Sequence, residues 1–112
     1  MTPRNTIDPG RLAKKAQEVS EILAGLAHPA RLRILCRLCE GEATVAELQE
    51  ACGLEQAPTS QFLARMRAEK RVSSRREGKS VLYALSDPRL LELMRAIAAI
   101  YCNPGNRMGG AA

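Results

Sequence analysis

The sequence is poor in aromatic side chains and contains no long apolar run. Its 112 residues include no Trp, two Tyr and one Phe. The longest uninterrupted apolar run, residues 96–102, has seven members, whereas a helix that crosses a membrane needs about 20. No apolar signal region follows the N-terminus. The length and these absences predict a single soluble, cytoplasmic domain with no membrane partner.

The composition favours helices over a β-sandwich. Ala and Leu are frequent, and both are strong helix formers, whereas β-sheets are enriched in the aromatic residues that this chain lacks. A small helical chain with few aromatic anchors often completes its core by pairing with a second copy. We therefore predict a mainly helical homodimer.

Positive charge is concentrated in one part of the chain. The net charge is +5, and residues 62–79 account for all of it with seven bases and two acids. A basic patch on an otherwise neutral protein is what binding to a phosphate backbone requires. A solvated charged face is the alternative interpretation.

Apolar residues recur at helical spacing in the first third of the chain. From Pro9 onward a stripe at three- and four-residue intervals predicts one helix, and its members are Leu12, Ala16, Val19, Leu23 and Leu26. His28 and Pro29 interrupt it, and Pro is favoured at the first position of a new helix. The second helix should end at Gly41, where glycine can cap it.

The next segment predicts two short helices joined by a turn. Thr44 and Glu47 have the spacing of a capping box, in which each side chain bonds a free amide of the other residue. The helix that they open ends at Gly53, and another helix begins near Pro58. Two such helices form a helix-turn-helix, whose second helix normally enters the major groove of DNA.

A β-hairpin and a last helix follow. Residues 72–76 and 80–85 have strand composition, and the loop 77–79 contains a glycine suited to a tight turn. Asp87 and Pro88 cap and begin a helix that runs to Cys102. The element order is α-α-α-α-β-β-α, a winged helix-turn-helix over residues 9–102, with flexible tails at 1–8 and 103–112. The hairpin is the wing, and its basic residues Arg75, Arg76 and Lys79 are predicted to lie along the phosphates.

The ordered motifs resemble the ArsR/SmtB family of winged-helix bacterial repressors. The matching stretches are LAHPARLRIL at 26–35, EATVAEL at 42–48, TSQFLARMR at 59–67 and the wing as far as Tyr83. Two positions depart from the family pattern: Phe62 stands where His is usual, and Glu55 stands where many relatives have Ser.

The resemblance implies a homodimer, joined through the first and last helices, that represses transcription at a near-palindromic DNA operator. It also implies that the recognition helix supplies the base-reading side chains, with two arginines nearer the phosphates. By position these residues are Gln56, Thr59, Ser60, Gln61, Arg65 and Arg67.

The cysteines resemble those of the persulfide- and redox-sensing branch of the family, typified by SqrR, BigR and HlyU. In that branch a cysteine of the second helix and one of the last helix form a disulfide or polysulfide bridge with reactive sulfur species, and DNA is released. Cys36 and Cys102 occupy these positions. Cys39 and Cys52 are expected to be small buried apolar residues.

Three alternatives remain open from the sequence. A repressor that responds to a soft metal would use Cys36, Cys39 or Cys102, although Val45 and Glu47 stand where the family's Cys-x-Cys metal site would be. The spacing of Cys36 and Cys39 also fits a thiol oxidoreductase, but no strand precedes it. A protein-binding adaptor would not need the basic wing. We predict neither enzymatic activity, a cofactor nor a metal site, and we expect His28 to begin a helix.

Overall fold

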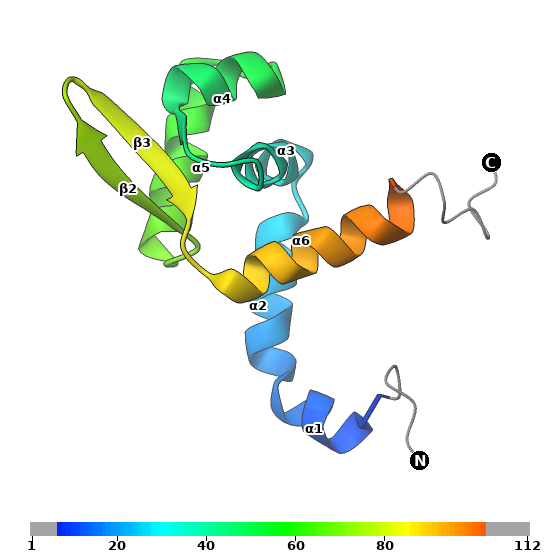
Figure 1. Cartoon of the computed structure of the whole chain (residues 1–112). Coiled ribbons are helices and arrows are strands. Elements are labelled where there is room, and N and C mark those ends of the chain that lie inside the picture. The colour runs from blue at the N-terminus through cyan, green and yellow to red at the C-terminus, as the bar shows by residue number, and fades with distance from the viewer. Residues whose placement is uncertain (1–6, 103–112) are drawn as a thin grey trace.

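The computed structural model describes residues 7–102, so residues 1–6 and 103–112, most of the two predicted tails, lie outside it. Its elements, in chain order, are α1 (Pro9–Lys14), α2 (Ala16–Leu26), α3 (Pro29–Leu38), β1 (Ala43–Thr44), α4 (Val45–Cys52), α5 (Gln56–Ala68), β2 (Val72–Glu77), β3 (Ser80–Leu85) and α6 (Pro88–Tyr101). The hairpin β2–β3 projects at one end beside α4 and α5, and α1 lies at the other end (Figure 1). No helix in the described part is long and apolar enough to cross a membrane.

The first predicted helix is divided into two. The backbone of Lys15 leaves the helical region at φ −99° and ψ 4°, and its amide donates to the carbonyl of Leu12 at 3.0 Å. This three-residue closure tightens the last turn of α1 and ends it. The prediction of one continuous helix from Pro9 to Leu26 was therefore wrong at this point.

The predicted starts of α3 and α4 are confirmed, and each is capped by a side chain. Nδ1 of His28 accepts from the amide of Ala30 at 3.1 Å and caps α3. Thr44 and Glu47 form the reciprocal capping box of α4. The second helix ends at Leu38, three residues before Gly41, and α5 begins two residues before Pro58.

The sheet has three antiparallel strands in the order β1-β3-β2. Glu77 pairs with Ser80, so the turn consists of two residues, and Gly78 adopts a φ of +62° there. The pairing of Ala43 with Tyr83 adds the short strand β1, which the sequence did not predict. Its two residues have no period from which a strand can be recognised, and only contact with β3 defines it.

The core lies where α3, α4, α5 and α6 meet the base of the hairpin. Ile34, Leu48, Leu63 and Met66 are at most 1% exposed, and the partly buried rings of Phe62 and Tyr83 pack at its edge. Leu63 and Met66 fix one face of α5 in this core, so the opposite face of the helix is directed outward.

Candidate DNA interface and cysteine groove

The outward face of α5 carries most of the predicted base-reading side chains. Gln56, Ser60 and Gln61 are exposed, whereas Leu63 and Met66 hold the other side of the helix in the core. Amide and hydroxyl groups can donate to and accept from base edges in the major groove. The helix begins after Glu55, whose side chain makes no capping hydrogen bond.

Thr59 does not belong to this surface. Its side chain is completely buried, and its hydroxyl donates to the carbonyl of Glu55 at 2.7 Å. A buried hydroxyl that donates to the carbonyl of the preceding turn has its hydrogen bond within the helix and cannot contact a DNA base. The prediction that Thr59 reads DNA is therefore wrong, because one face of any helix in a small domain must be packed.

Phe62 joins the recognition helix to the start of α3. Its ring centroid lies 4.9 Å from that of His28, and the guanidinium carbon of Arg31 lies 5.5 Å from the ring centre. Nε of Arg31 is buried without a hydrogen-bond partner in the described part of the chain, and the cation–π contact compensates part of that cost. At this departure from the family pattern the ring therefore packs between elements and offers no hydrogen bond to a base.

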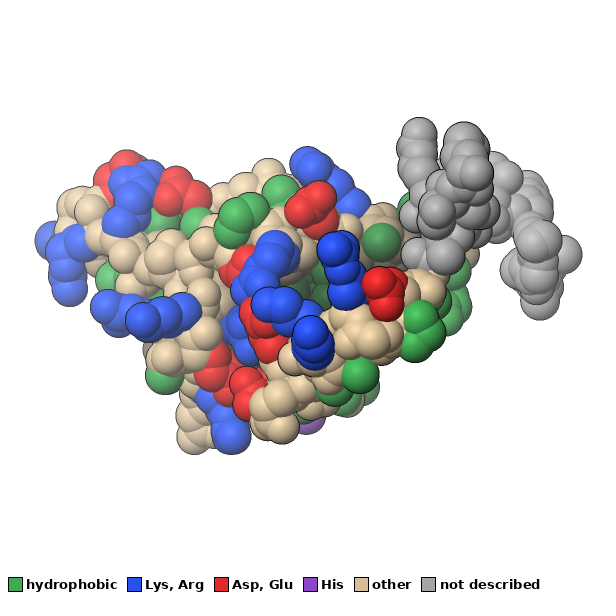
Figure 2. Space-filling view, turned by 90° about the horizontal axis from the view of Figure 1, so that it is seen from below, with side chains coloured by type: hydrophobic (Ala, Val, Ile, Leu, Met, Phe, Trp, Pro, Cys, Tyr) green, Lys and Arg blue, Asp and Glu red, His purple; other side chains and the backbone are tan. Residues whose placement is uncertain are grey.

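The basic side chains of residues 62–79 divide into those with an acidic partner and those without one. Arg65 lies 3.7 Å from Glu69, and Arg71 lies 3.9 Å from Asp87. Across residues 7–102, no acidic side chain lies within ion-pair distance of Arg67, Lys70, Arg76 or Lys79. Figure 2 shows the underside of the molecule as a mosaic in which Lys and Arg alternate with Asp and Glu towards the centre. Because some of the basic side chains of residues 62–79 are paired with carboxylates, less positive charge is available to phosphates than the sequence suggests.

In the wing, Arg75 is engaged by two carboxylates. Its Nε and Nη2 each donate to Glu42 at 2.7 Å, and Nη1 donates to Glu77 at 3.0 Å. The hydrogen bond from Arg75 holds the pKa of Glu42 below its ordinary value. Glu42 precedes β1, so this pair fastens the hairpin to the segment before α4. Arg76 and Lys79 are also exposed near the turn, and they have no acidic partner among residues 7–102.

Cys36 and Cys102 line the same groove. Cys36 lies on α3, and Cys102 caps the C-terminal end of α6. The groove between the two helices has a volume of about 340 Å³, and its remaining lining residues are Leu32, Met94, Ile97, Ala98 and Tyr101. Both cysteines are free thiols and both are exposed. Packing thus brings together two thiols that lie 66 positions apart in the sequence.

The other two cysteines lie outside this groove. Cys52 is buried in the core, and burial raises the pKa of its thiol. Burial also raises the pKa of Cys39, with a smaller contribution from Cys36 nearby. Because the thiolate is the reactive form, both positions are disfavoured as nucleophiles. In the described part of the chain no three His, Cys, Asp or Glu side chains gather as a metal-binding group.

A second apolar groove lies on α1 and α2. It has a volume of about 480 Å³, and its lining residues include Ile7, Leu12, Val19 and Leu23. Leu12 and Leu23 are about half exposed, and on α6 Tyr101 is 81% exposed. These helices present the apolar faces that the sequence assigned to contact with a second copy.

Comparison with known proteins agrees with this arrangement. Residues 28–71 match the family described as bacterial regulatory protein, arsR family. The chain is 40% identical to the biofilm growth-associated repressor of Agrobacterium fabrum over 93 residues. This alignment covers 83% of this chain and 80% of that repressor. The structure of the transcriptional repressor BigR from Xylella fastidiosa aligns with a TM-score of 0.81 at 35% identity, over 86% of this chain and 98% of BigR.

A homodimeric winged helix-turn-helix DNA-binding domain from Mycobacterium bovis, described as a possible ArsR-family transcriptional regulator, aligns with a TM-score of 0.69. The two sequences are 26% identical, over 88% of this chain and 89% of that domain. The predicted fold class, mainly helical with a β-hairpin wing, is confirmed.

Proposed function

The chain belongs to the ArsR family of bacterial regulatory proteins, in its BigR-like branch, and from this membership we propose that it is a repressor controlled by reactive sulfur. It is a transcriptional regulator and not an enzyme. In the proposed mechanism it binds a near-palindromic operator as a homodimer, and bridging of Cys36 to Cys102 releases the DNA. The observation that carries the proposal is that both thiols line one apolar groove.

The DNA contacts are divided between α5 and the wing. Gln56, Ser60 and Gln61 read base edges, because they are the exposed polar side chains of the recognition helix. Arg67, Arg76 and Lys79 contact phosphates, supported by their exposure and by the lack of an acidic partner among residues 7–102. Arg65 contributes after release from its weak, exposed pair with Glu69.

The dimer forms through the apolar faces of α1, α2 and α6. The groove on α1 and α2 and the exposed Ile100 and Tyr101 support this interface, because a monomer leaves them in water. A two-fold dimer presents two recognition helices to successive major grooves of one DNA face, about 34 Å apart.

The sulfur chemistry uses the two thiols in sequence. One cysteine thiolate attacks the outer sulfur of a hydropersulfide RSSH, which forms a cysteine persulfide and releases RSH. The second thiolate then attacks the inner sulfur of that persulfide, forms the disulfide and expels H₂S after protonation. Alternatively, two cysteine persulfides condense to a trisulfide with loss of one H₂S. The open groove supports the trisulfide, since an inserted sulfur spans a wider gap than a direct bond.

The bridge acts by joining α3 to α6. Because α6 also belongs to the proposed dimer face, a displacement of α6 changes the separation of the two recognition helices. Release then follows from a shift in the population of dimers that match the operator, with the reading face itself intact.

The test combines mass spectrometry with operator binding. Cys36→Ser and Cys102→Ser are each expected to bind the operator when reduced and to stay bound after treatment with an alkyl hydropersulfide donor. Cys39→Ser is the matched control, because it removes a thiol from the C-terminal end of α3 that lies outside the groove, and it should release DNA as the parent does. A Cys102→Ser protein that still leaves its operator would refute the mechanism.

Response to a soft metal through Cys36, Cys39 or Cys102 is the second candidate function, since Cys36 and Cys102 line one groove and Cys39 lies near Cys36. Metal titration with thiol-specific absorbance separates it from the first. A metal that releases the operator from the parent protein, with hydropersulfide having no effect, would favour this alternative.

A further inference from the structure

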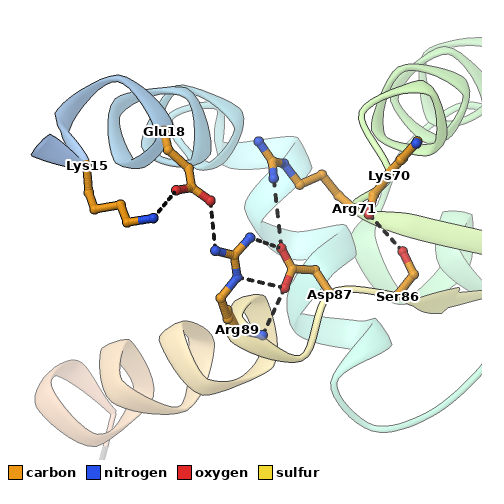
Figure 3. A network of polar contacts seen from close by, with 7 residues as sticks. All are labelled: Lys15, Glu18, Lys70, Arg71, Ser86, Asp87 and Arg89. Atoms are coloured by element: carbon orange, nitrogen blue, oxygen red, sulfur yellow. Dashed lines mark hydrogen bonds and ion pairs between the residues drawn. The ribbon is translucent and has the colours of Figure 1, made fainter.

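Two turns of the chain are bonded to each other at the base of the wing. One turn leads from α5 into β2, and the other leads from β3 into α6. The amide of Ser86 donates to the carbonyl of Arg71 at 3.0 Å. The hydroxyl of Ser86 donates to the carbonyl of Lys70 at 2.9 Å (Figure 3). The entry to the last helix is thus attached directly to the end of the recognition helix.

The recognition helix ends in an unusual conformation at this place. Lys70 has a φ of +63° and is the one non-glycine residue with positive φ in the described chain. The amides of Lys70 and Arg71 donate to the carbonyls of Arg67 and Met66 at 2.9 and 2.8 Å, the pattern in which glycine usually ends a helix. A lysine held there needs support from its surroundings, and the bond from Ser86 to its carbonyl is part of that support.

Asp87 extends the junction to two further helices. Its carboxylate caps α6 by accepting from the amide of Arg89 at 3.0 Å, and it also lies 3.9 Å from the guanidinium of Arg71. The side chains of Asp87 and Arg71 are only 13% and 19% exposed. Arg89 in turn donates to Glu18 on α2 at 2.7 Å, so α2, α6 and the start of β2 meet in one polar cluster (Figure 3).

The two ends of α6 are therefore held differently. The N-terminal end is fixed by Ser86, Asp87 and Arg89, whereas Tyr101 and Cys102 at the other end are exposed beside the groove. The helix has 14 residues and a length of about 21 Å at 1.5 Å per residue. Because the N-terminal end is bonded to its neighbours, a displacement of the C-terminal end turns the helix about its N-terminal end.

We propose that Ser86 and Asp87 are positioning residues that transmit the tilt of α6 to the recognition helix and the wing. The proposal deepens the proposed function and rests on it for the origin of the tilt. A sulfur bridge draws Cys102 towards α3, and α6 turns about the junction. The displacement of Ser86 passes through the carbonyls of Lys70 and Arg71 to the end of α5 and to β2. The two residues make no contact with DNA themselves.

The first experiment measures how strongly bridging and DNA binding are coupled. Asp87→Asn keeps an oxygen to cap α6 but removes the charge that faces Arg71 and Arg89. Ser86→Ala removes the bond to Lys70 from an exposed position. The matched control is Asp8→Asn, because Asp8 caps α1 in the same way and lies 3.8 Å from Arg11.

Operator affinity is compared for reduced protein and for protein bridged with a hydropersulfide donor, with the extent of bridging read by intact mass. The parent and the control should lose affinity by roughly tenfold or more on bridging, within the usual range of coupling between sites. The two junction variants should form the bridge equally well, keep reduced-state affinity within about threefold, and lose less than about threefold on bridging. Junction variants that retain the full parental loss would overturn the proposal.

A second perturbation tests the junction without sulfur chemistry. Ala98 lines the groove, so Ala98→Trp should push α6 away from α3 and change operator affinity in the reduced protein. The same substitution in the Asp87→Asn background should have little effect. An equal change in both backgrounds, or none in either, would refute the junction. If the parent fails to respond to bridging while this cycle shows coupling, the proposed sulfur response is wrong and the junction stands.

Discussion

The wing carries three basic side chains, and one of them is predicted to contribute less to DNA binding than the other two. Arg76 and Lys79 are exposed near the turn, whereas each of the three guanidinium nitrogens of Arg75 donates a hydrogen bond to Glu42 or Glu77. Each phosphate contact contributes about 0.9 to the slope of log affinity against log salt. In a dimer, one substitution removes two contacts, so Arg76→Ala and Lys79→Ala should each flatten the slope by about 1.8.

The expected effect is large enough to measure. Between 50 and 200 mM salt, a slope difference of about 1.8 means that the parent loses roughly 12 times more affinity than the variant. Arg75→Ala should leave the slope nearly unchanged, because its charge is already balanced by Glu42 and Glu77. Glu42→Gln should steepen the slope by releasing Arg75 towards the DNA.

The assay is fluorescence anisotropy of a labelled operator duplex at four or more salt concentrations. Arg11→Ala is the matched control, because Arg11 is an exposed arginine on α1 with an acidic partner at 3.8 Å. If Arg75→Ala flattens the slope as much as Arg76→Ala does, Arg75 exchanges its carboxylates for phosphate and the reasoning from the ion pair is wrong.

Three further predictions concern stability and reactivity. Thr44→Ala removes the acceptor for the amide of Glu47 and should lower the free energy of unfolding by about 1 kcal/mol in a urea titration; Thr44→Ser should retain most of it, and equal losses would contradict the capping role. Hydrogen bonds from Arg75 and Arg89 hold the pKa values of Glu42 and Asp87 below their ordinary values of 4.5 and 3.8. The unfolded chain therefore binds protons at higher pH than the folded chain, so the free energy of unfolding should be level above about pH 5 and fall as pH drops below it. The fall should be less steep in Glu42→Gln, and a variant that follows the parental curve would contradict this. Iodoacetamide with peptide mass mapping at pH 8 should label Cys36 and Cys102 before Cys39 and Cys52, because burial raises the pKa of the latter two thiols; early labelling of Cys52 would show that the core opens readily.

Local signals in the sequence were sufficient for most of the elements. The capping box at Thr44, the glycine at position 53 and the Asp87–Pro88 start each specify a helix end through bonds to their immediate neighbours. Strand composition on both sides of a turn at Gly78 specified the wing in the same way. Such contacts depend on a few consecutive residues, so their chemistry can be read along the chain.

Other features depended on contacts between distant residues. The sequence placed Thr59 and Gln61 alike in the recognition helix, but only packing against the core decided that Thr59 is buried and Gln61 exposed. The sequence placed three basic side chains in the wing. The approach of Glu42, 33 positions from Arg75, decided which of these side chains is neutralised.

By itself the sequence determined a basic winged helix-turn-helix, because helical and strand periods and caps are local properties. Its resemblance to a family of repressors singled out two of the four thiols. The tertiary structure alone decided that Cys36 and Cys102 share one groove and that Ser86 and Asp87 join α6 to the end of α5. These arrangements arise when helices pack in three dimensions, and packing depends on the shapes of surfaces whose residues lie far apart in the chain.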